Sequence, residues 1–305
     1  MEKPIAIFGF GRSGTTWLSD IISKSLGEII LFEPFHPSVW NQAESNCYRT
    51  NNDLDYHQKY QTHLDACYSK QIKNPWLLRN HVGVNPLEFS ESFINMVWSN
   101  SKISGFKTIR GNHLMSHFEM DHNCIYIVRH PLSVLASILK RPRFFEEFGW
   151  NFHRQEFFKR AIKHQVFNHE SLPNMDGLSK TEIIAAMWTI STIIAFEDIE
   201  KYNIPFVYYE DLYTKPYDET KELLINLGYE NKNLHPSYLF TPSMLTLKTA
   251  HNFDKKGDEF VNAGPKAFWK DTFSEREEMK LIDFIRSTVS PFKMARKKLE
   301  RYFVV

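Results

Sequence analysis

The stretch IAIFGFGRSGTTWL, residues 5–18, constrains the fold of this chain more than any other. An apolar run of strand-forming residues leads into a glycine-rich turn and then into an apolar-periodic segment, which predicts a strand, a phosphate-binding loop and a helix. The P-loop pattern G-x-x-x-x-G-K-S/T can be laid on Gly9 to Thr16, but Thr15 stands where the lysine belongs. The cation within the loop is Arg12. The sequence therefore predicts an anion site that lacks the lysine of the nucleoside triphosphatases.

Strand-like and helix-like segments alternate along the rest of the chain. Short apolar runs lie at 4–9, 28–32, 103–107, 124–128 and 204–209. Helical patterns lie at 14–25, 131–140 and 211–227, and a final helix is expected at 274–288. This alternation predicts an α/β fold in which a central, mostly parallel sheet is flanked by helices. With 305 residues, of which 42% are hydrophobic, we expect a single P-loop-like domain over residues 1–305.

Two segments interrupt this alternation and are expected to be helical insertions. Residues 34–100 are polar and punctuated by prolines, and residues 141–180 are basic and aromatic. Insertions beside the ends of strands commonly carry substrate specificity. We therefore expect these two insertions to form the acceptor site.

The charge balance and the cysteine count exclude several classes of protein. The formal net charge is +1, from 37 basic and 36 acidic side chains, so a nucleic-acid partner is not expected and any anion site must be local. Cys47, Cys67 and Cys124 are too few for a disulfide framework and favour a reducing compartment. No apolar run reaches about 20 residues, and the first strand follows the N-terminus almost directly. The sequence thus predicts a cytoplasmic protein without a membrane span and leaves the oligomeric state open.

The glycine-rich loop supplies the chemistry of an anion site. Gly9, Gly11 and Gly14 let the backbone approach a ligand closely, and the N–H groups at the start of the helix point together. Thr15 and Thr16 add hydroxyl donors. No apolar run that ends in a metal-binding aspartate is evident, so hydrolysis of a triphosphate with Mg²⁺ is disfavoured.

A second stretch, CIYIVRHPLSVLAS over residues 124–137, predicts another anion-binding element. Pro131 suits the first turn of a helix, so Arg129 stands at the end of a strand and Ser137 lies two turns into the helix. A guanidinium can hold a phosphate through two hydrogen bonds, with the serine as a further donor. The alternative is a salt bridge at the strand end and a serine on the helix surface.

Together the two stretches resemble the sulfotransferases that use 3′-phosphoadenosine 5′-phosphosulfate. GRSGTTWL is similar to the family's 5′-phosphosulfate loop, and YIVRHPLSVLAS is similar to its 3′-phosphate element. VYYEDL at 207–212 resembles a strand-to-helix step, and KAFWK at 266–270 resembles the tryptophan-bearing loop before the last helix. Four motifs in order over residues 5–274 carry the resemblance, whereas residues 38–100 and 141–200 carry no match.

The resemblance implies a donor site that needs no metal. 3′-Phosphoadenosine 5′-phosphosulfate would be the co-substrate, and 3′-phosphoadenosine 5′-phosphate would be the product. Trp17 and Tyr209 would pack near the adenine, with ordinary core aromatics as the alternative. The implied donor-binding residues are Arg12, Ser13, Gly14, Thr15, Thr16, Trp17, Arg129, Ser137, Tyr209, Lys256 and Lys266.

Sulfuryl transfer develops charge on the leaving phosphate oxygen and requires the attacking hydroxyl to lose a proton. The resemblance places Arg12 at the leaving oxygen, where a fixed cation stabilises that charge. Glu33 follows a strand in a segment similar to the F-E-P step of carbohydrate sulfotransferases and is implied as the base, with a cap or salt bridge as the alternative. His36 and His113 are rival bases. Lys107, at a strand end, could contact the sulfuryl oxygens or be a surface lysine.

A zinc site is not expected from the spacing of His113 and His117. No glutamate follows the first histidine, and no third ligand is evident. The sequence thus predicts an enzyme that moves a sulfuryl group to a hydroxyl, on a carbohydrate or glycolipid. A P-loop kinase or nucleoside triphosphatase acting on a small molecule, or a non-catalytic nucleotide-binding protein, is the alternative. The sequence does not identify the acceptor or the position that is sulfated.

Overall fold

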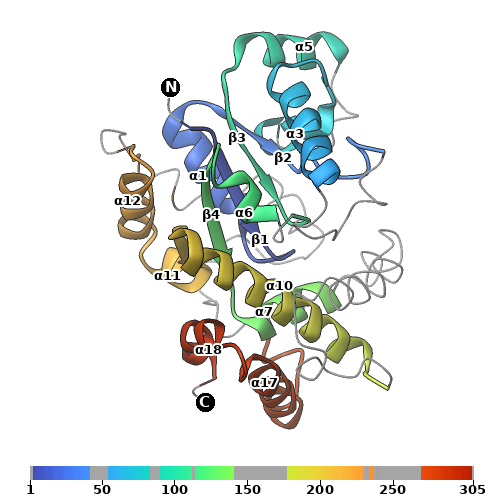
Figure 1. Cartoon of the computed structure of the whole chain (residues 1–305), viewed down its shortest axis with the longest axis vertical. Helices are drawn as coiled ribbons and strands as arrows, with labels where there is room; N and C mark the ends of the chain where they lie inside the picture. The colour runs from blue at the N-terminus through green and yellow to red at the C-terminus, as the bar shows by residue number, and fades with distance from the viewer. Residues whose placement is uncertain are drawn as a thin grey trace.

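The computed structural model describes residues 3–41, 54–82, 90–111, 114–140, 177–229, 234–235, 239 and 269–303. At its centre lies a sheet of five strands in the order β2-β3-β1-β4-β5 (Figure 1). Every described pairing of these strands is parallel. The carboxyl ends of all the strands therefore meet at one edge of the sheet, where the loops that follow them gather.

The strands lie where the apolar runs predict them. Their bounds are Ile5–Gly9 for β1, Ile29–Phe32 for β2, Ile103–Thr108 for β3, Asn123–Val128 for β4 and Phe206–Tyr208 for β5. β1 is buried along its whole length, as expected for a strand that is covered on both faces. The predicted α/β architecture with a central parallel sheet is confirmed.

Side chains of β1 alternate between two hydrophobic clusters. Ala6 and Phe8 belong to the larger cluster on one face of the sheet. Ile5 and Ile7 belong to the smaller cluster on the other face, together with Leu18 of the following helix. Successive side chains of a strand point to opposite faces, so this apolar run can be buried from both sides. The loop after β1 therefore starts from a firmly packed strand.

Helices cover both faces of the sheet (Figure 1). The smaller cluster includes side chains of α1 (Thr15–Leu26), α11 (Tyr209–Thr214) and α12 (Pro216–Asn226). The larger cluster includes side chains of α3 (Leu54–Tyr68), the 3-10 helix η1 (Pro75–Leu78), α5 (Glu91–Asn100), α6 (Met115–Phe118), α7 (Pro131–Leu139), α10 (Lys180–Tyr202), α17 (Glu275–Val289), α18 (Lys293–Leu299) and η5 (Glu300–Tyr302). The short helix α4 (Arg79–Val82) packs against β2 and η1.

The prediction of a single helix at 211–227 is wrong, because the structure has two helices there. Pro216 begins α12, and Lys215 before it has a φ of −133° and a ψ of 56°. Proline lacks a backbone donor and disfavours a helical conformation of the preceding residue, so the helix breaks at this point.

The helix α10 was not expected from the sequence. Its residues 184–193 are all buried, so the sequence lacks the regular alternation of apolar and polar residues that marks a helix with one exposed face. A capping box at Ser179 and Glu182 begins this helix.

Within the insertion at 34–100 the structure describes the helices α3, η1, α4 and α5, and also turns and irregular segments at 34–41 and 69–74. The insertion expected at 141–180 lies outside the described residues up to residue 176. Among the described helices, none is long and apolar enough to cross a membrane.

Candidate functional site

The loop between β1 and α1 has the backbone of an anion-binding turn. Arg12 and Gly14 have left-handed φ angles of 71° and 97°, and Gly14 is the N-cap of α1. Left-handed residues in such a turn direct neighbouring N–H groups to one side. A Cβ on Gly14 would lie 2.5 Å from Cδ2 of Tyr209, so only glycine fits beneath that ring.

Arg12 joins the two anion-binding motifs of the sequence. Its Nε donates a hydrogen bond to Oγ of Ser137 on α7, at 2.9 Å. Its carbonyl oxygen accepts a hydrogen bond from the Nη1 of Arg129, at 3.2 Å. These partners are 125 and 117 positions away along the chain. The fold therefore brings the residues of both motifs into one site.

Ser13 carries a buried hydroxyl within the same loop. The residue is 1% exposed, and its Oγ has no hydrogen-bond partner among the described residues. A buried donor that stays unpaired costs free energy, so such groups commonly meet a ligand or an ordered water. Thr15 is also buried, and Thr16 is half-buried. The loop thus fits an oxyanion, which would satisfy the Ser13 hydroxyl.

Trp17 and Tyr209 are neighbours beside this loop. Their ring centroids lie 5.6 Å apart in an edge-on arrangement. The guanidinium carbon of Arg129 lies 4.2 Å from the centroid of the Tyr209 ring. Both rings pack against the smaller hydrophobic cluster and stay partly exposed. The aromatic residues expected near an adenine therefore adjoin the residues expected at the phosphates.

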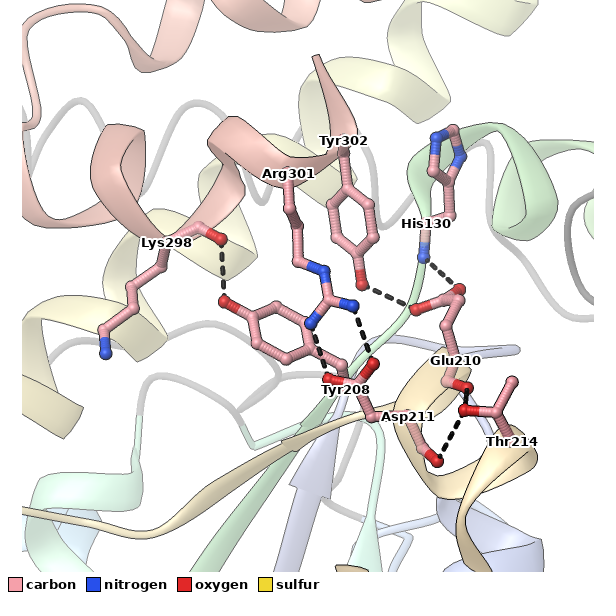
Figure 2. Close-up of polar contacts among 8 residues, drawn as sticks. All are labelled: His130, Tyr208, Glu210, Asp211, Thr214, Lys298, Arg301 and Tyr302. Carbon is pink, nitrogen blue, oxygen red and sulfur yellow. Dashed lines mark hydrogen bonds and ion pairs between the residues drawn. The ribbon is translucent and has the colours of Figure 1, made fainter. Parts of the chain in front are cut away.

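Glu210 holds the backbone at His130, as Figure 2 shows. One carboxylate oxygen of Glu210 accepts a hydrogen bond from the backbone N–H of His130 at 2.9 Å, and the other accepts one from the Tyr302 hydroxyl at 2.7 Å. Burial and the charge of Glu210 raise the pKa of Tyr302 well above its ordinary value, so the phenol remains a donor. Because His130 directly follows Arg129, Glu210 positions the turn between β4 and α7.

The C-terminal segment is attached at a second point in the same region. Arg301 donates two hydrogen bonds to the carboxylate of Asp211, each at 2.6 Å (Figure 2). The Tyr208 hydroxyl donates to a backbone carbonyl of α18 at 2.7 Å. Trp269 stacks on the ring of His130, with the centroids 4.2 Å apart. The tryptophan of the fourth motif thus lies against the turn that follows β4.

Glu33 and Lys107 form a buried ion pair at the ends of β2 and β3. Lys107 Nζ lies 2.6 Å from Oε1 of Glu33, and both side chains are almost fully buried. Lys107 is therefore not a surface lysine. Burial alone would raise the pKa of Glu33, but the charges of Lys107 and Arg110 outweigh it and bring the pKa below its ordinary value. Glu33 is thus ionised at the carboxyl edge of the sheet, in the salt bridge that the sequence offered as the alternative to a base.

His36 accepts a hydrogen bond through its ring in this structure. Its ring stacks on Trp76 with the centroids 4.1 Å apart, and its Nδ1 accepts the backbone N–H of Ser38 at 3.1 Å. Burial lowers the pKa of the ring to about 4. The neutral ring therefore keeps its proton on Nε2, and this arrangement disfavours His36 as the base.

Three predicted site residues, His113, Lys256 and Lys266, lie outside the described residues. Within the described residues, no group of three or more His, Cys, Asp and Glu side chains could hold a metal ion.

Two charged residues near the ion pair carry no sequence motif. Asp20 is buried in α1, and burial raises its pKa to about 7 against the attraction of Lys24 and Lys107. The guanidinium carbon of Arg79, at the start of α4, lies 4.5 Å from the ring centroid of Trp76. Neither residue could be identified from the sequence, because each acquires its surroundings only when distant segments pack together.

Comparisons with known proteins identify the family. The model of the sulfotransferase domain matches residues 2–298 of the chain. Among solved structures, the chain is similar to a sulfotransferase domain from the curacin biosynthetic pathway, with 13% identity, a TM-score of 0.45 and coverage of 96% of this chain and 98% of that one. It is also similar to a sulfotransferase domain from the Synechococcus PCC 7002 olefin synthase, with 16% identity, a TM-score of 0.42 and coverage of 93% and 94%. The search of curated proteins gave no match. Because the family model covers nearly its whole length, this chain belongs to the sulfotransferase domain family.

Proposed function

We propose that this chain transfers a sulfuryl group from 3′-phosphoadenosine 5′-phosphosulfate to a hydroxyl group, with residues 1–305 acting as one domain. The observation that carries the proposal is the hydrogen bond between Arg12 of the β1–α1 loop and Ser137 of α7, at 2.9 Å. This contact joins a turn suited to a 5′-phosphosulfate with an element suited to a 3′-phosphate. A donor with anionic groups on both sides of its ribose would occupy both, whereas ATP has no group for the second element.

The β1–α1 loop would bind the 5′ end of the donor. Its backbone N–H groups and the hydroxyls of Ser13, Thr15 and Thr16 would donate to the phosphosulfate oxygens. Arg12 would lie at the bridging oxygen, where negative charge develops as the sulfur–oxygen bond breaks. These groups are positive or are donors without help from a metal, so the proposed reaction requires none.

The β4–α7 turn would bind the other end of the donor. Arg129 and Ser137 would hold the 3′-phosphate, since a guanidinium can donate two parallel hydrogen bonds to one phosphate. Trp17 and Tyr209 would flank the adenine. The closeness of Arg129 to the Tyr209 ring, at 4.2 Å, supports a shared role for these residues in nucleotide binding.

Glu33 would accept the proton of the attacking hydroxyl. Its pairing with Lys107 keeps its pKa low and makes it a weak base in the arrangement described. If Lys107 turned toward the sulfuryl oxygens of a bound donor, the buried carboxylate would lose its cation and its pKa would rise. The pair would thereby couple removal of the proton to the presence of the donor.

We propose a carbohydrate or glycolipid as the acceptor. A pocket of about 570 Å³ lies in the insertion that follows β2, lined by Trp40, Gln58, Lys59, Thr62, His63, Ala66 and Ile72. His63 Nε2 donates a hydrogen bond to the carbonyl of Pro34 at 2.9 Å, and Pro34 directly follows Glu33. An aromatic ring beside hydroxyl and amide groups suits a sugar, and His63 links the pocket to the residue that follows the proposed base.

Calorimetric binding of 3′-phosphoadenosine 5′-phosphate tests the donor site. The wild type, Arg129→Ala and the exposed-arginine control Arg276→Ala would be compared, each also with ATP and Mg²⁺. We expect metal-free binding that Arg129→Ala weakens at least about tenfold, because charge-assisted hydrogen bonds are lost, and that Arg276→Ala preserves. Binding of ATP with Mg²⁺ that ignores Arg129→Ala would contradict the proposal and favour a kinase or triphosphatase.

A further inference from the structure

We propose that the acceptor is an acidic hydroxyl compound and that Arg79 binds its anionic group, a carboxylate, sulfate or phosphate. The inference rests on the proposed function and narrows the class of acceptor. Arg79 begins α4, in the insertion that follows β2.

The guanidinium of Arg79 is held against aromatic rings. Its central carbon lies 4.5 Å from the centroid of Trp76 and 5.8 Å from that of Phe32. Across the described ranges, Arg79 forms no ion pair, and its buried Nε has no hydrogen-bond partner. Burial lowers its pKa, partly offset by nearby Glu33, but an arginine side chain stays charged in proteins. A half-buried cation with unused donors is suited to bind an anion.

This part of the site has more positive than negative charge. Lys107 Nζ lies 3.7 Å from the centroid of Phe32, so Arg79 and Lys107 share this ring. The described charged groups that interact here are Arg79, Lys107, Arg110 and Lys24 with the carboxylates of Glu33 and Asp20. Even with Asp20 ionised, these cations outnumber the carboxylates. A further negative group would reduce this excess of positive charge.

The anionic groups of the donor would lie at another part of the sheet edge. Arg12 follows β1 and Arg129 follows β4, whereas α4 and η1 pack on β2, which lies beyond β3. Neighbouring strands are about 4.8 Å apart, so β2 lies roughly 10 Å from β1. A sulfuryl group at Arg12 could reach Lys107 on β3, but Arg79 lies one strand further on. The anion at Arg79 would therefore come from the acceptor.

A further N–H group belongs to the ring on which Arg79 packs. Trp76 Nε1 is buried and has no hydrogen-bond partner within the described part of the chain. An oxyanion that reached both this group and Arg79 would accept hydrogen bonds from two side chains. A purely structural arginine would not require such a donor near it.

Thermal unfolding of the full chain, saturated with 3′-phosphoadenosine 5′-phosphate, tests the inference. Sodium sulfate, phosphate or acetate would be titrated at an ionic strength held constant with sodium chloride. Wild type and the control Arg276→Met should show a saturable rise in Tm, which Arg79→Met loses. Arg79→Gln serves as a second neutral variant in case Arg79→Met does not fold. A response to acetate alone would identify a carboxylate, and a response to sulfate and phosphate would identify a tetrahedral anion.

Glucuronate and glucose provide a matched acidic and neutral sugar for the same assay. We expect glucuronate to bind the wild type about tenfold or more tightly than glucose, and this preference to disappear in Arg79→Met. Equal responses of wild type and Arg79→Met to every anion and to both sugars would overturn the inference. If 3′-phosphoadenosine 5′-phosphate itself fails to raise the Tm of the wild type, the proposed function is wrong instead, so the two failures are distinguishable.

Discussion

At the scale of single residues, two residues that we propose take part in the reaction have a backbone conformation that is rare for residues with a Cβ. Arg12 and Glu33 have φ angles of 71° and 45°, a region that costs a residue with a Cβ roughly 1–2 kcal/mol. Lys70 and Asn203 also have positive φ, but they lie just after α3 and α10, where left-handed residues commonly end helices. No helix ends at Arg12 or Glu33. Their strained backbone instead sets the direction in which each chain segment leaves the sheet.

Arg12→Met should chiefly lower kcat. We expect a fall of about 10²–10³ with a much smaller change in donor affinity, because the cation acts most strongly on charge that develops in the transition state. Arg12→Lys keeps the charge and should recover part of the rate. The measurement is steady-state transfer from 3′-phosphoadenosine 5′-phosphosulfate, with calorimetry of the product nucleotide. A rise in KM with an unchanged kcat would assign Arg12 to ground-state binding instead.

Asp20→Asn should stabilise the protein more at high pH than at low pH. The pKa of Asp20 rises from its ordinary value of 3.8 to about 7 in the folded protein, chiefly through burial. Between these values the folded state holds a proton that the unfolded state has released, so stability falls as pH rises and the loss remains above pH 7. The variant should gain up to about 4 kcal/mol at pH 8 and less than half of that at pH 5.

Urea unfolding at these two pH values would measure the effect, with exposed Glu222→Gln as the control carboxylate. Since other groups titrate equally in variant and wild type, their contributions cancel in the difference. The same gain at both pH values would show that Asp20 is ionised in the folded state.

At the scale of secondary-structure elements, the turn between β4 and α7 depends on Glu210. Glu210→Ala leaves the His130 N–H and the Tyr302 hydroxyl without their acceptor, at a cost of about 1–3 kcal/mol. We expect affinity for 3′-phosphoadenosine 5′-phosphate to fall about tenfold, since Arg129 precedes His130. Glu210→Gln retains an acceptor for His130 and should stay within about threefold of the wild type.

Calorimetry of these variants beside exposed Glu222→Ala separates positioning from general loss of stability. If Glu210→Ala lowers Tm but leaves nucleotide affinity unchanged, Glu210 only supports the fold.

The sequence predicts those elements whose signals are local. The β1–α1 loop is marked by its own glycines, and the strands by their own apolar runs, so both are found within a few residues. α10 has no polar face to mark it. The contact of Glu210 with Tyr302 joins residues 92 positions apart, and Arg79 meets Phe32 only after η1 packs on β2. Such contacts depend on how the elements are arranged in the fold. Local sequence motifs and the spacing of apolar residues do not predict that arrangement.

At the scale of the whole molecule, the proposed reaction divides the sheet edge between two tasks. The residues proposed to bind the donor follow β1, β4 and β5, while Glu33 and Lys107 lie at the ends of β2 and β3 on the other side of β1. Strand order alone produces this division, because it places β2 and β3 on one side of β1 and places β4 and β5 on the other. Loops that belong to one side can vary without disturbing the other.

Glu33→Gln should therefore abolish transfer without weakening the donor. We expect kcat to fall by about 10² or more, since the base is lost, and affinity for 3′-phosphoadenosine 5′-phosphate to stay within about twofold, since this nucleotide has no sulfuryl group for Lys107 to contact. Glu28→Gln, at the other end of β2, is the matched control and should change neither. A large loss of nucleotide affinity in Glu33→Gln would show that the two sides are not separate.

The hydrogen bond from Tyr302 to Glu210 has a consequence for the order in which the protein folds. Translation delivers the turn after β4 early and the residue that completes its support much later, after α17 and α18 have been made. A contact between segments so distant in sequence forms late, because the intervening chain must first be ordered. Until Tyr302 docks, the Glu210 carboxylate lacks its link to the C-terminal segment. The final rigidity of this turn is therefore a late product of folding, although the strand before it is made early.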